Sequence, residues 1–129
     1  MSKSPVTCHV LDSSTGKPAD GVAVTLQELT TAKYDGGPDI FDPLGRGQTN
    51  SDGRCLDLLS IRNPQDEPFK LVEGRTYKVV FKTKEYFDRT NRKCFYPWVE
   101  ISFAIENPDE HYHIPLLISP YGFTTYRGS

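Results

Sequence analysis

The sequence predicts an all-β protein built as a two-sheet antiparallel β-sandwich. Short runs in which apolar and polar residues alternate recur along the chain, as in strands with one buried face. Clusters of Gly, Pro, Asn and Asp separate these runs, which is typical of sandwiches rather than of alternating helices and strands. We expect about seven or eight strands and one short helix. The 129 residues suit a single domain spanning residues 1–129.

The first two runs predict a hairpin. Residues 6–11 place apolar side chains at alternate positions and put His9 on the opposite face. Residues 13–18 have the composition of a turn, and residues 21–29 then alternate in the same way. We therefore expect these two strands to pair with each other.

The next stretch predicts loop structure. Residues 30–47 are polar and rich in Gly, Pro and Asp, so we expect a long surface loop there. Such a loop could shade the mouth of a site or decorate the surface, and decoration is favoured. Residues 48–54 then predict a tight turn, because Asn, Asp and Gly supply turn geometry, and Arg54 follows from its end.

The middle of the chain predicts further strands around one helix. Apolar character resumes at residues 55–59, and residues 76–82 and 97–105 alternate with period two. Residues 83–91 lack this alternation, so a single short helix is expected there.

The last stretch, residues 111–129, carries the strongest indication of a site. As a strand it has one apolar face, made of Tyr112, Ile114, Leu116 and Ile118. His111 and His113 lie on the opposite face. Packing alone would not select imidazoles, because each buried ring nitrogen needs a hydrogen-bond partner. The terminal residues 126–129 (Tyr-Arg-Gly-Ser) follow closely and are also expected to be functional.

Composition excludes several classes of function. The 15 basic and 17 acidic residues nearly balance, which argues against binding to nucleic acid or to an anionic membrane. No apolar run approaches the ~20 residues that span a bilayer, and residues 1–5 lack the apolar block of a signal peptide. Cys8, Cys55 and Cys94 match neither a disulfide framework nor a zinc site, so we expect reduced, mostly structural thiols. The chain is expected to be cytoplasmic.

Several motifs together resemble one family. Residues 113–117 (His-Ile-Pro-Leu-Leu), followed by the terminal residues 126–129, resemble the 5-hydroxyisourate hydrolases, the transthyretin-related enzymes of urate breakdown. Residues 8–12 (Cys-His-Val-Leu-Asp), 16–19 (Gly-Lys-Pro-Ala) and 49–54 (Thr-Asn-Ser-Asp-Gly-Arg) extend the resemblance over nearly the whole chain. The motifs are specific in combination, although each alone is weak.

The resemblance implies a transthyretin-like sandwich that assembles into a homotetramer with active sites at the dimer–dimer interface. It implies hydrolysis of 5-hydroxyisourate at the lactam N1–C6 bond, giving 2-oxo-4-hydroxy-4-carboxy-5-ureidoimidazoline, without a cofactor or a metal. Compared with the family pattern, the predicted loop at residues 30–47 is extended. Animal relatives are often peroxisomal, which makes the peroxisome the alternative compartment, although no Ser-Lys-Leu signal ends the chain.

The family motif selects His113 rather than His111, because its histidine directly precedes Ile-Pro-Leu. The expected catalytic residues are His9, Arg54, His113 and Ser129. The expected substrate-binding residues are His9, Arg54, Tyr126, Arg127 and Gly128. A neutral imidazole suits the activation of water, and the planar donor fork of arginine suits a flat, carbonyl-rich substrate. Which histidine is base and which is acid stays open.

Two other classes of function compete with this interpretation. His9, His111 and His113 could form a three-histidine zinc site, but no nearby carboxylate or cysteine pattern reinforces it. A non-catalytic small-molecule carrier, like transthyretin, would keep the fold and the central channel. The polar terminal motif argues against a carrier, because an aromatic hormone would leave its donors unpaired.

Overall fold

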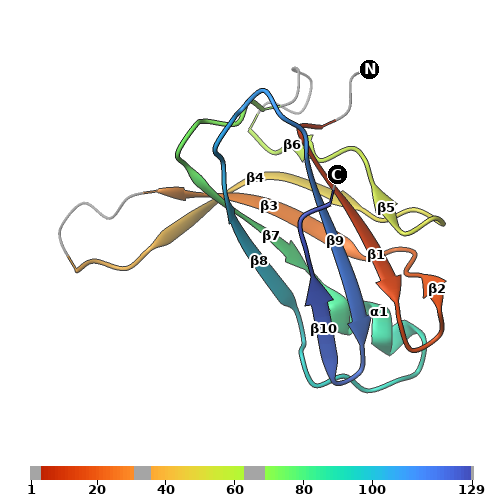
Figure 1. Cartoon of the computed structure of the whole chain (residues 1–129). Coiled ribbons are helices and arrows are strands. Elements are labelled where there is room, and N and C mark those ends of the chain that lie inside the picture. Colours follow the sequence, from red (N-terminus) through yellow and green to blue (C-terminus); the bar gives the residue numbers. More distant parts are fainter. Residues whose placement is uncertain (1–3, 31–35, 63–68, 129) are drawn as a thin grey trace.

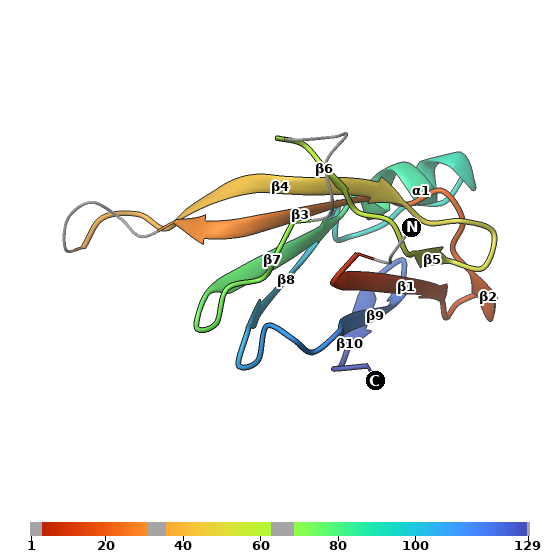
Figure 2. The ribbon, with the colours of Figure 1, turned by 90° about the horizontal axis from the view of Figure 1, so that it is seen from above.

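Two five-stranded sheets pack against each other in the computed structural model, which describes residues 4–30, 36–62 and 69–128 (Figures 1 and 2). The strand order is β10-β9-β1-β2 in the first sheet, with β5 also on β1, and β6-β4-β3-β7-β8 in the second. The elements are β1 (Val6–Asp12), β2 (Lys17–Pro18), β3 (Ala23–Thr30), β4 (Ile40–Gln48), β5 (Arg54–Cys55), β6 (Leu59–Ser60), β7 (Thr76–Phe81), α1 (Thr83–Arg89), β8 (Val99–Ala104), β9 (Tyr112–Ser119) and β10 (Gly122–Thr125). The predicted all-β sandwich with one short helix is confirmed.

The core lies between the sheets and takes one face of the longer strands, among them β1, β3 and β9. The largest fully buried side chains include Leu26, Tyr77, Phe81, Phe87 and Leu116, which come from both sheets and from α1. The apolar face predicted for the last strand is buried throughout. Alternation thus identified the core-facing side chains, because a strand between core and surface buries every second residue.

The predicted hairpin between residues 6–11 and 21–29 is wrong. β1 pairs with β2, β5 and β9, whereas β3 lies in the other sheet and pairs with β4 and β7. The connection after β1 therefore carries the chain from one sheet to the other. Alternation shows which face of a strand is buried but not which strand lies beside it, so the two apolar faces meet across the core instead.

The prediction of a surface loop over residues 30–47 is also wrong for much of its length. β4 pairs with β3 from Thr30↔Ile40 to Ala23↔Gln48, with one irregularity in the register. Gly47, one of the glycines that suggested a loop, serves close packing, since a Cβ there would lie 2.6 Å from Cys55 Sγ and 2.8 Å from the Asp57 carbonyl oxygen.

The C-terminal end of β3 and the N-terminal end of β4 extend beyond the neighbouring strands (Figures 1 and 2). The part of the extended segment at residues 31–35 lies outside the described residues. That this segment decorates the surface rather than shading a site stays a prediction.

The end of the chain folds back on itself. The sequence suggested one strand and a tail, but β9 turns at Pro120 and Tyr121 into β10, which pairs antiparallel with it. Beyond β10, Gly128 forms an isolated bridge with His113, and its N–H donates to the His113 carbonyl at 3.0 Å. This bridge places the terminal motif beside the first residues of β9.

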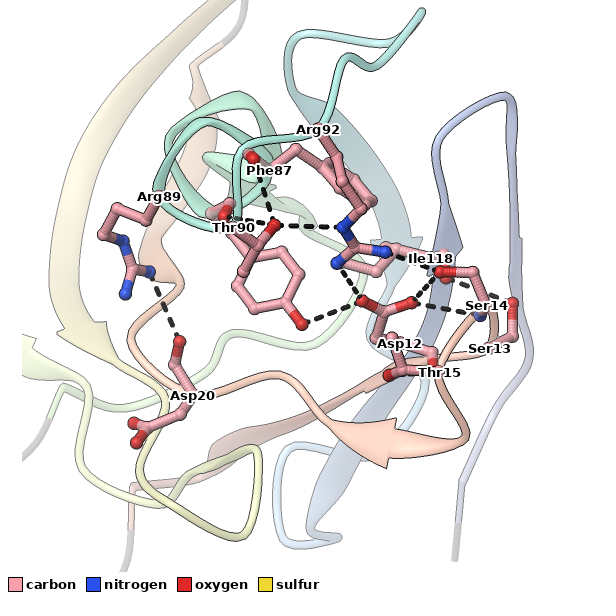
Figure 3. Close-up of polar contacts among 11 residues, drawn as sticks. Asp12, Ser13, Ser14, Thr15, Asp20, Phe87, Arg89, Thr90, Arg92 and Ile118 are labelled. Atoms are coloured by element: carbon pink, nitrogen blue, oxygen red, sulfur yellow. Dashed lines mark hydrogen bonds and ion pairs between the residues drawn. The ribbon is translucent and has the colours of Figure 1, made fainter.

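A buried carboxylate ties the end of β1 to the segment after α1 (Figure 3). The Asp12 side chain is fully buried, and it accepts hydrogen bonds from the Tyr86 hydroxyl at 2.8 Å, the Ser14 N–H at 3.0 Å and the Arg92 guanidinium. Burial by itself raises the pKa of the Asp12 carboxyl, but the hydrogen bonds from Arg92, Ser14 and Tyr86 outweigh burial and lower it below its usual value. The carboxylate is therefore charged and structural at neutral pH.

Candidate active site

His9 and Arg54 are register partners in the antiparallel pair of β1 and β5. The neighbouring pair, Cys8 and Cys55, points into the core as buried thiols, so His9 and Arg54 project from the opposite face of the sheet. His9 is half-buried and Arg54 is exposed. The sheet thus presents an imidazole and a guanidinium side by side on its outer face.

The predicted turn before Arg54 is confirmed, and its hydrogen bonds place the arginine. The Asn50 side-chain oxygen accepts from the N–H of Asp52 at 2.9 Å and from the N–H of Arg54 at 3.1 Å. Gly53 adopts φ 75°, and a Cβ there would lie 2.3 Å from the Val10 carbonyl oxygen. Glycine is therefore required at this position by both conformation and space.

The His9 ring is oriented by the same turn. Its Nε2 lies 3.1 Å from the backbone carbonyl oxygen of Asp52. Because a carbonyl oxygen only accepts hydrogen bonds, Nε2 of His9 must carry the hydrogen. A neutral His9 ring then holds its lone pair on Nδ1.

His113 joins this face through the parallel pairing of β1 with β9. The register places Thr7 beside His113 and His9 beside Pro115. The centroids of the His9 and His113 rings lie 6.4 Å apart with an interplanar angle of 36°. The two predicted histidines, which come from opposite ends of the sequence, therefore lie near each other on the face from which Arg54 projects.

His113 and His111 differ in their position and burial, and the assignment of His113 rather than His111 to the site stays a prediction. His113 lies within β9 and is half-buried, whereas His111 precedes the strand and is exposed. Both rings contact the Thr7 hydroxyl, through His111 Nε2 at 2.8 Å and His113 Nδ1 at 2.8 Å. Sequence reasoning missed Thr7, although it lies two residues before His9 and therefore on the same strand face.

The terminal motif reaches the site through Gly128. A Cβ on this residue would lie 2.7 Å from His113 Cδ2 and 3.0 Å from Pro115 Cγ, so the glycine packs directly on the imidazole. Tyr126 is 59% exposed and thus open to a ligand. The Arg127 guanidinium is paired with Glu110 at 2.8 Å and lies 4.8 Å from the centroid of the Tyr112 ring. Ser129 lies outside the described residues.

The described residues offer no metal centre. Within residues 4–30, 36–62 and 69–128, no group of three or more His, Cys, Asp or Glu side chains is arranged to hold a metal ion. The zinc hypothesis for His9, His111 and His113 therefore gains no support from this part of the chain. No helix among the described residues has the length and apolar character needed to cross a membrane.

The fold and this face define the class of protein. Two five-stranded sheets, with the parallel β1–β9 pair at the centre of one and helix α1 after β7, form a transthyretin-like sandwich. The model of the HIUase/Transthyretin family matches residues 6–128, so the chain belongs to this family.

Both 5-hydroxyisourate hydrolases and transthyretins resemble the chain. A 5-hydroxyisourate hydrolase of Salmonella dublin is 40% identical over 124 residues, which cover 96% of this chain and 80% of the relative. The structure of Klebsiella pneumoniae 5-hydroxyisourate hydrolase is 31% identical, with a TM-score of 0.71, and the match covers 99% of this chain and 100% of that one. Sea bream transthyretin in complex with thyroxine is 27% identical, with a TM-score of 0.74, over 96% of this chain and 94% of that one. The fold alone therefore does not decide the activity, and the residues of the site must.

Proposed function

We propose that this chain is an enzyme that hydrolyses 5-hydroxyisourate in urate degradation. The observation that carries the proposal is the meeting of His9, Arg54 and His113 on the outer face of one sheet. The names of the Salmonella and Klebsiella relatives support the same substrate. A transthyretin-like carrier has no need for two imidazoles and a guanidinium at one place.

The proposed reaction is the attack of water on the C6 carbonyl of the substrate lactam. One imidazole removes a proton from water as the new C–O bond forms, and negative charge develops on the carbonyl oxygen. The N1–C6 bond then breaks, and a protonated imidazole supplies the proton that the departing nitrogen takes up. The ring separation of 6.4 Å allows His9 and His113 to serve the two sides of one small substrate.

Arg54 is proposed to hold the substrate carbonyls and the developing oxyanion. Its guanidinium carries a permanent charge and presents parallel N–H donors, which match a flat ligand with adjacent oxygen atoms. Its exposed position opposite His9 leaves it available to substrate.

The terminal motif is proposed to complete the site. Tyr126 and Arg127 would bind or orient the substrate, and Ser129 is assigned a catalytic role by the family resemblance. Gly128 supports His113 by lying against its ring, where a larger residue would displace the imidazole. The ion pair of Arg127 with Glu110 is exposed and therefore weak enough to exchange for a substrate contact.

A homotetramer with the active sites at the dimer–dimer interface is part of this proposal. The candidate face combines the polar groups with the half-buried Leu117 and the exposed Tyr126, a mixture suited to contact with a second sheet. Analytical ultracentrifugation of the purified protein would measure the assembly. The compartment stays the one predicted from sequence, the cytoplasm, with the peroxisome as the alternative.

The competing function is a non-catalytic carrier of a small aromatic ligand, which the similarity to sea bream transthyretin favours. The deciding experiment follows the decay of 5-hydroxyisourate generated in place by a urate oxidase. The proposal expects decay to accelerate in proportion to the concentration of this protein, and to return to the spontaneous rate in the His9→Asn and His113→Asn variants. A decay rate that the parent protein leaves unchanged would instead favour the carrier.

A further inference from the structure

One hydroxyl group is shared between two histidines beside the proposed site. Thr7 Oγ1 lies 2.8 Å from His113 Nδ1 and 2.8 Å from His111 Nε2. Both distances are those of direct hydrogen bonds. Of these three linked groups, the proposed mechanism uses only His113.

Hydrogen counting limits how these groups can be protonated. A threonine hydroxyl has one hydrogen to donate and two lone pairs with which to accept. If Thr7 donates to His111, Nδ1 of His113 must carry a hydrogen, and a neutral His113 ring then has its lone pair on Nε2. If Thr7 donates to His113 instead, the neutral ring carries its hydrogen on Nε2. The state of His113 is thus coupled to that of His111.

We infer that Thr7 and His111 are positioning residues that hold neutral His113 in the tautomer with its hydrogen on Nδ1. Thr7 donates to His111 Nε2 and accepts from His113 Nδ1, so the lone pair of His113 lies on Nε2, away from Thr7. The inference rests on the proposed function, because a general base needs that lone pair to take a proton from water. It assigns the role of base to His113, a choice that the sequence left open.

The surroundings fix the ring in this position. Thr7 is 2% exposed, its side chain is β-branched, and it is the register partner of His113 in the β1–β9 pair. Gly128 lies against Cδ2 on the other part of the same ring. The imidazole is therefore held from two sides, with Nδ1 toward the hydroxyl.

The tautomer itself can be measured without substrate. The chain has three histidines, so two-bond ¹H–¹⁵N correlation spectra of the full protein will show three imidazoles, which single substitutions assign. The ¹⁵N shifts of a neutral ring distinguish a nitrogen that carries a hydrogen from one with a lone pair, and a pH series identifies the spectra of the neutral rings. We expect His113 to be protonated on Nδ1 in the parent and to become a mixture of tautomers in Thr7→Val, which has the same shape without the hydroxyl.

Kinetics provide the second measurement. Thr7→Val should lower kcat at least ~10-fold with KM changed less than ~2-fold, since a tautomer effect acts on the chemical step. Thr7→Ser, which keeps the hydroxyl, should stay within ~3-fold of the parent. His111→Leu should follow Thr7→Val, and His111→Gln, which keeps a polar group near the Nε2 position, should recover part of the rate. Thr25→Val, in the half-buried middle of β3 in the other sheet, is the matched control.

The outcomes separate this inference from the proposed function. A His113 ring protonated on Nε2 in the parent, or a tautomer that Thr7→Val leaves unchanged, overturns the inference even if the protein hydrolyses 5-hydroxyisourate. A rise in KM with an unchanged kcat in His111→Leu also overturns it. A parent protein that hydrolyses no 5-hydroxyisourate removes the proposed function, and the spectra still decide how His113 is protonated. The His111 side chain is exposed, so the His111 variants should fold and still test the inference even if Thr7→Val folds poorly.

Discussion

His9 of β1 and Arg54 of β5 lie directly opposite each other on the outer face of the first sheet. The pair is set by backbone register rather than by a flexible loop, since the Asn50 side chain fixes the turn that ends at Arg54. In the proposed function, the guanidinium binds the same substrate that His9 contacts. The planar geometry of the Arg54 guanidinium, and not only its charge, is therefore expected to matter.

Replacing Arg54 by lysine should lower kcat/KM at least ~10-fold although the charge is kept, because an ammonium group cannot reproduce two parallel hydrogen bonds to a flat ligand. Steady-state kinetics of 5-hydroxyisourate decay measure the effect. Arg46→Lys, on the exposed face of β4 in the other sheet, is the control and should match the parent. An Arg54→Lys variant within ~2-fold of the parent would show that Arg54 only ends a turn.

Replacing Gly128 by alanine should lower kcat at least ~10-fold while the sandwich stays folded, because the added methyl group would lie 2.7 Å from His113 Cδ2 and must displace the ring. Circular dichroism and decay kinetics test the two halves of this expectation. Gly122→Ala is the matched control, since a Cβ there meets only Ser119 Oγ at an ordinary 3.6 Å. Equal activity in both variants would remove Gly128 from the support of His113.

Deleting residues 126–129 should abolish hydrolysis and leave the core intact, since the buried side chains of the sandwich come from earlier residues. The bridge between Gly128 and His113 would be lost with the segment. Circular dichroism, sizing chromatography and decay kinetics of the truncated protein provide the test. Full activity after the deletion would favour the carrier function.

Replacing Asp12 by asparagine should destabilise the fold by roughly 2–4 kcal/mol at neutral pH, because Arg92 and Tyr86 would lose their charged, buried acceptor. Urea unfolding measures the free energy. The exposed ion pair of Asp88 with Lys84 offers the control, and Asp88→Asn should cost less than ~1 kcal/mol.

The same carboxylate predicts a pH dependence of stability. The pKa of Asp12 is lower in the folded protein than in the unfolded chain, so its contribution is present above the unfolded value of about 4 and is lost as pH falls through the folded value. The parent should therefore lose more stability on acidification than Asp12→Asn does. Parallel acid losses in the two proteins would show that Asp12 is not responsible.

Dialysis against a chelator should leave both the rate and the fold unchanged, because the proposed chemistry uses imidazoles and a guanidinium and routes no step through a metal. Metal analysis of the active protein accompanies the assay. Stoichiometric zinc, with activity lost on its removal and restored on its return, would replace the proposed mechanism with the three-histidine alternative.

The sequence by itself determined the faces of the strands and the local turns. Alternation placed Val6 and Tyr112 in the core and His9 and His113 on the opposite face, and the turn before Arg54 followed from its Asn and Gly residues. These features depend on neighbours in the chain, whose chemistry the sequence displays directly.

Only the tertiary structure decided which strands meet. Alternation is the same whichever partner a strand has, so β1 could not be assigned to β9 and β5. The sequence of β4 resembles a loop because its glycines are required by close packing against Cys55 and neighbouring backbone. The placement of Arg54 beside His9, and of the Thr7 hydroxyl between His111 and His113, follows from that pairing. Closure of a common core selects the pairing through contacts between residues distant in sequence, and no local pattern records those contacts.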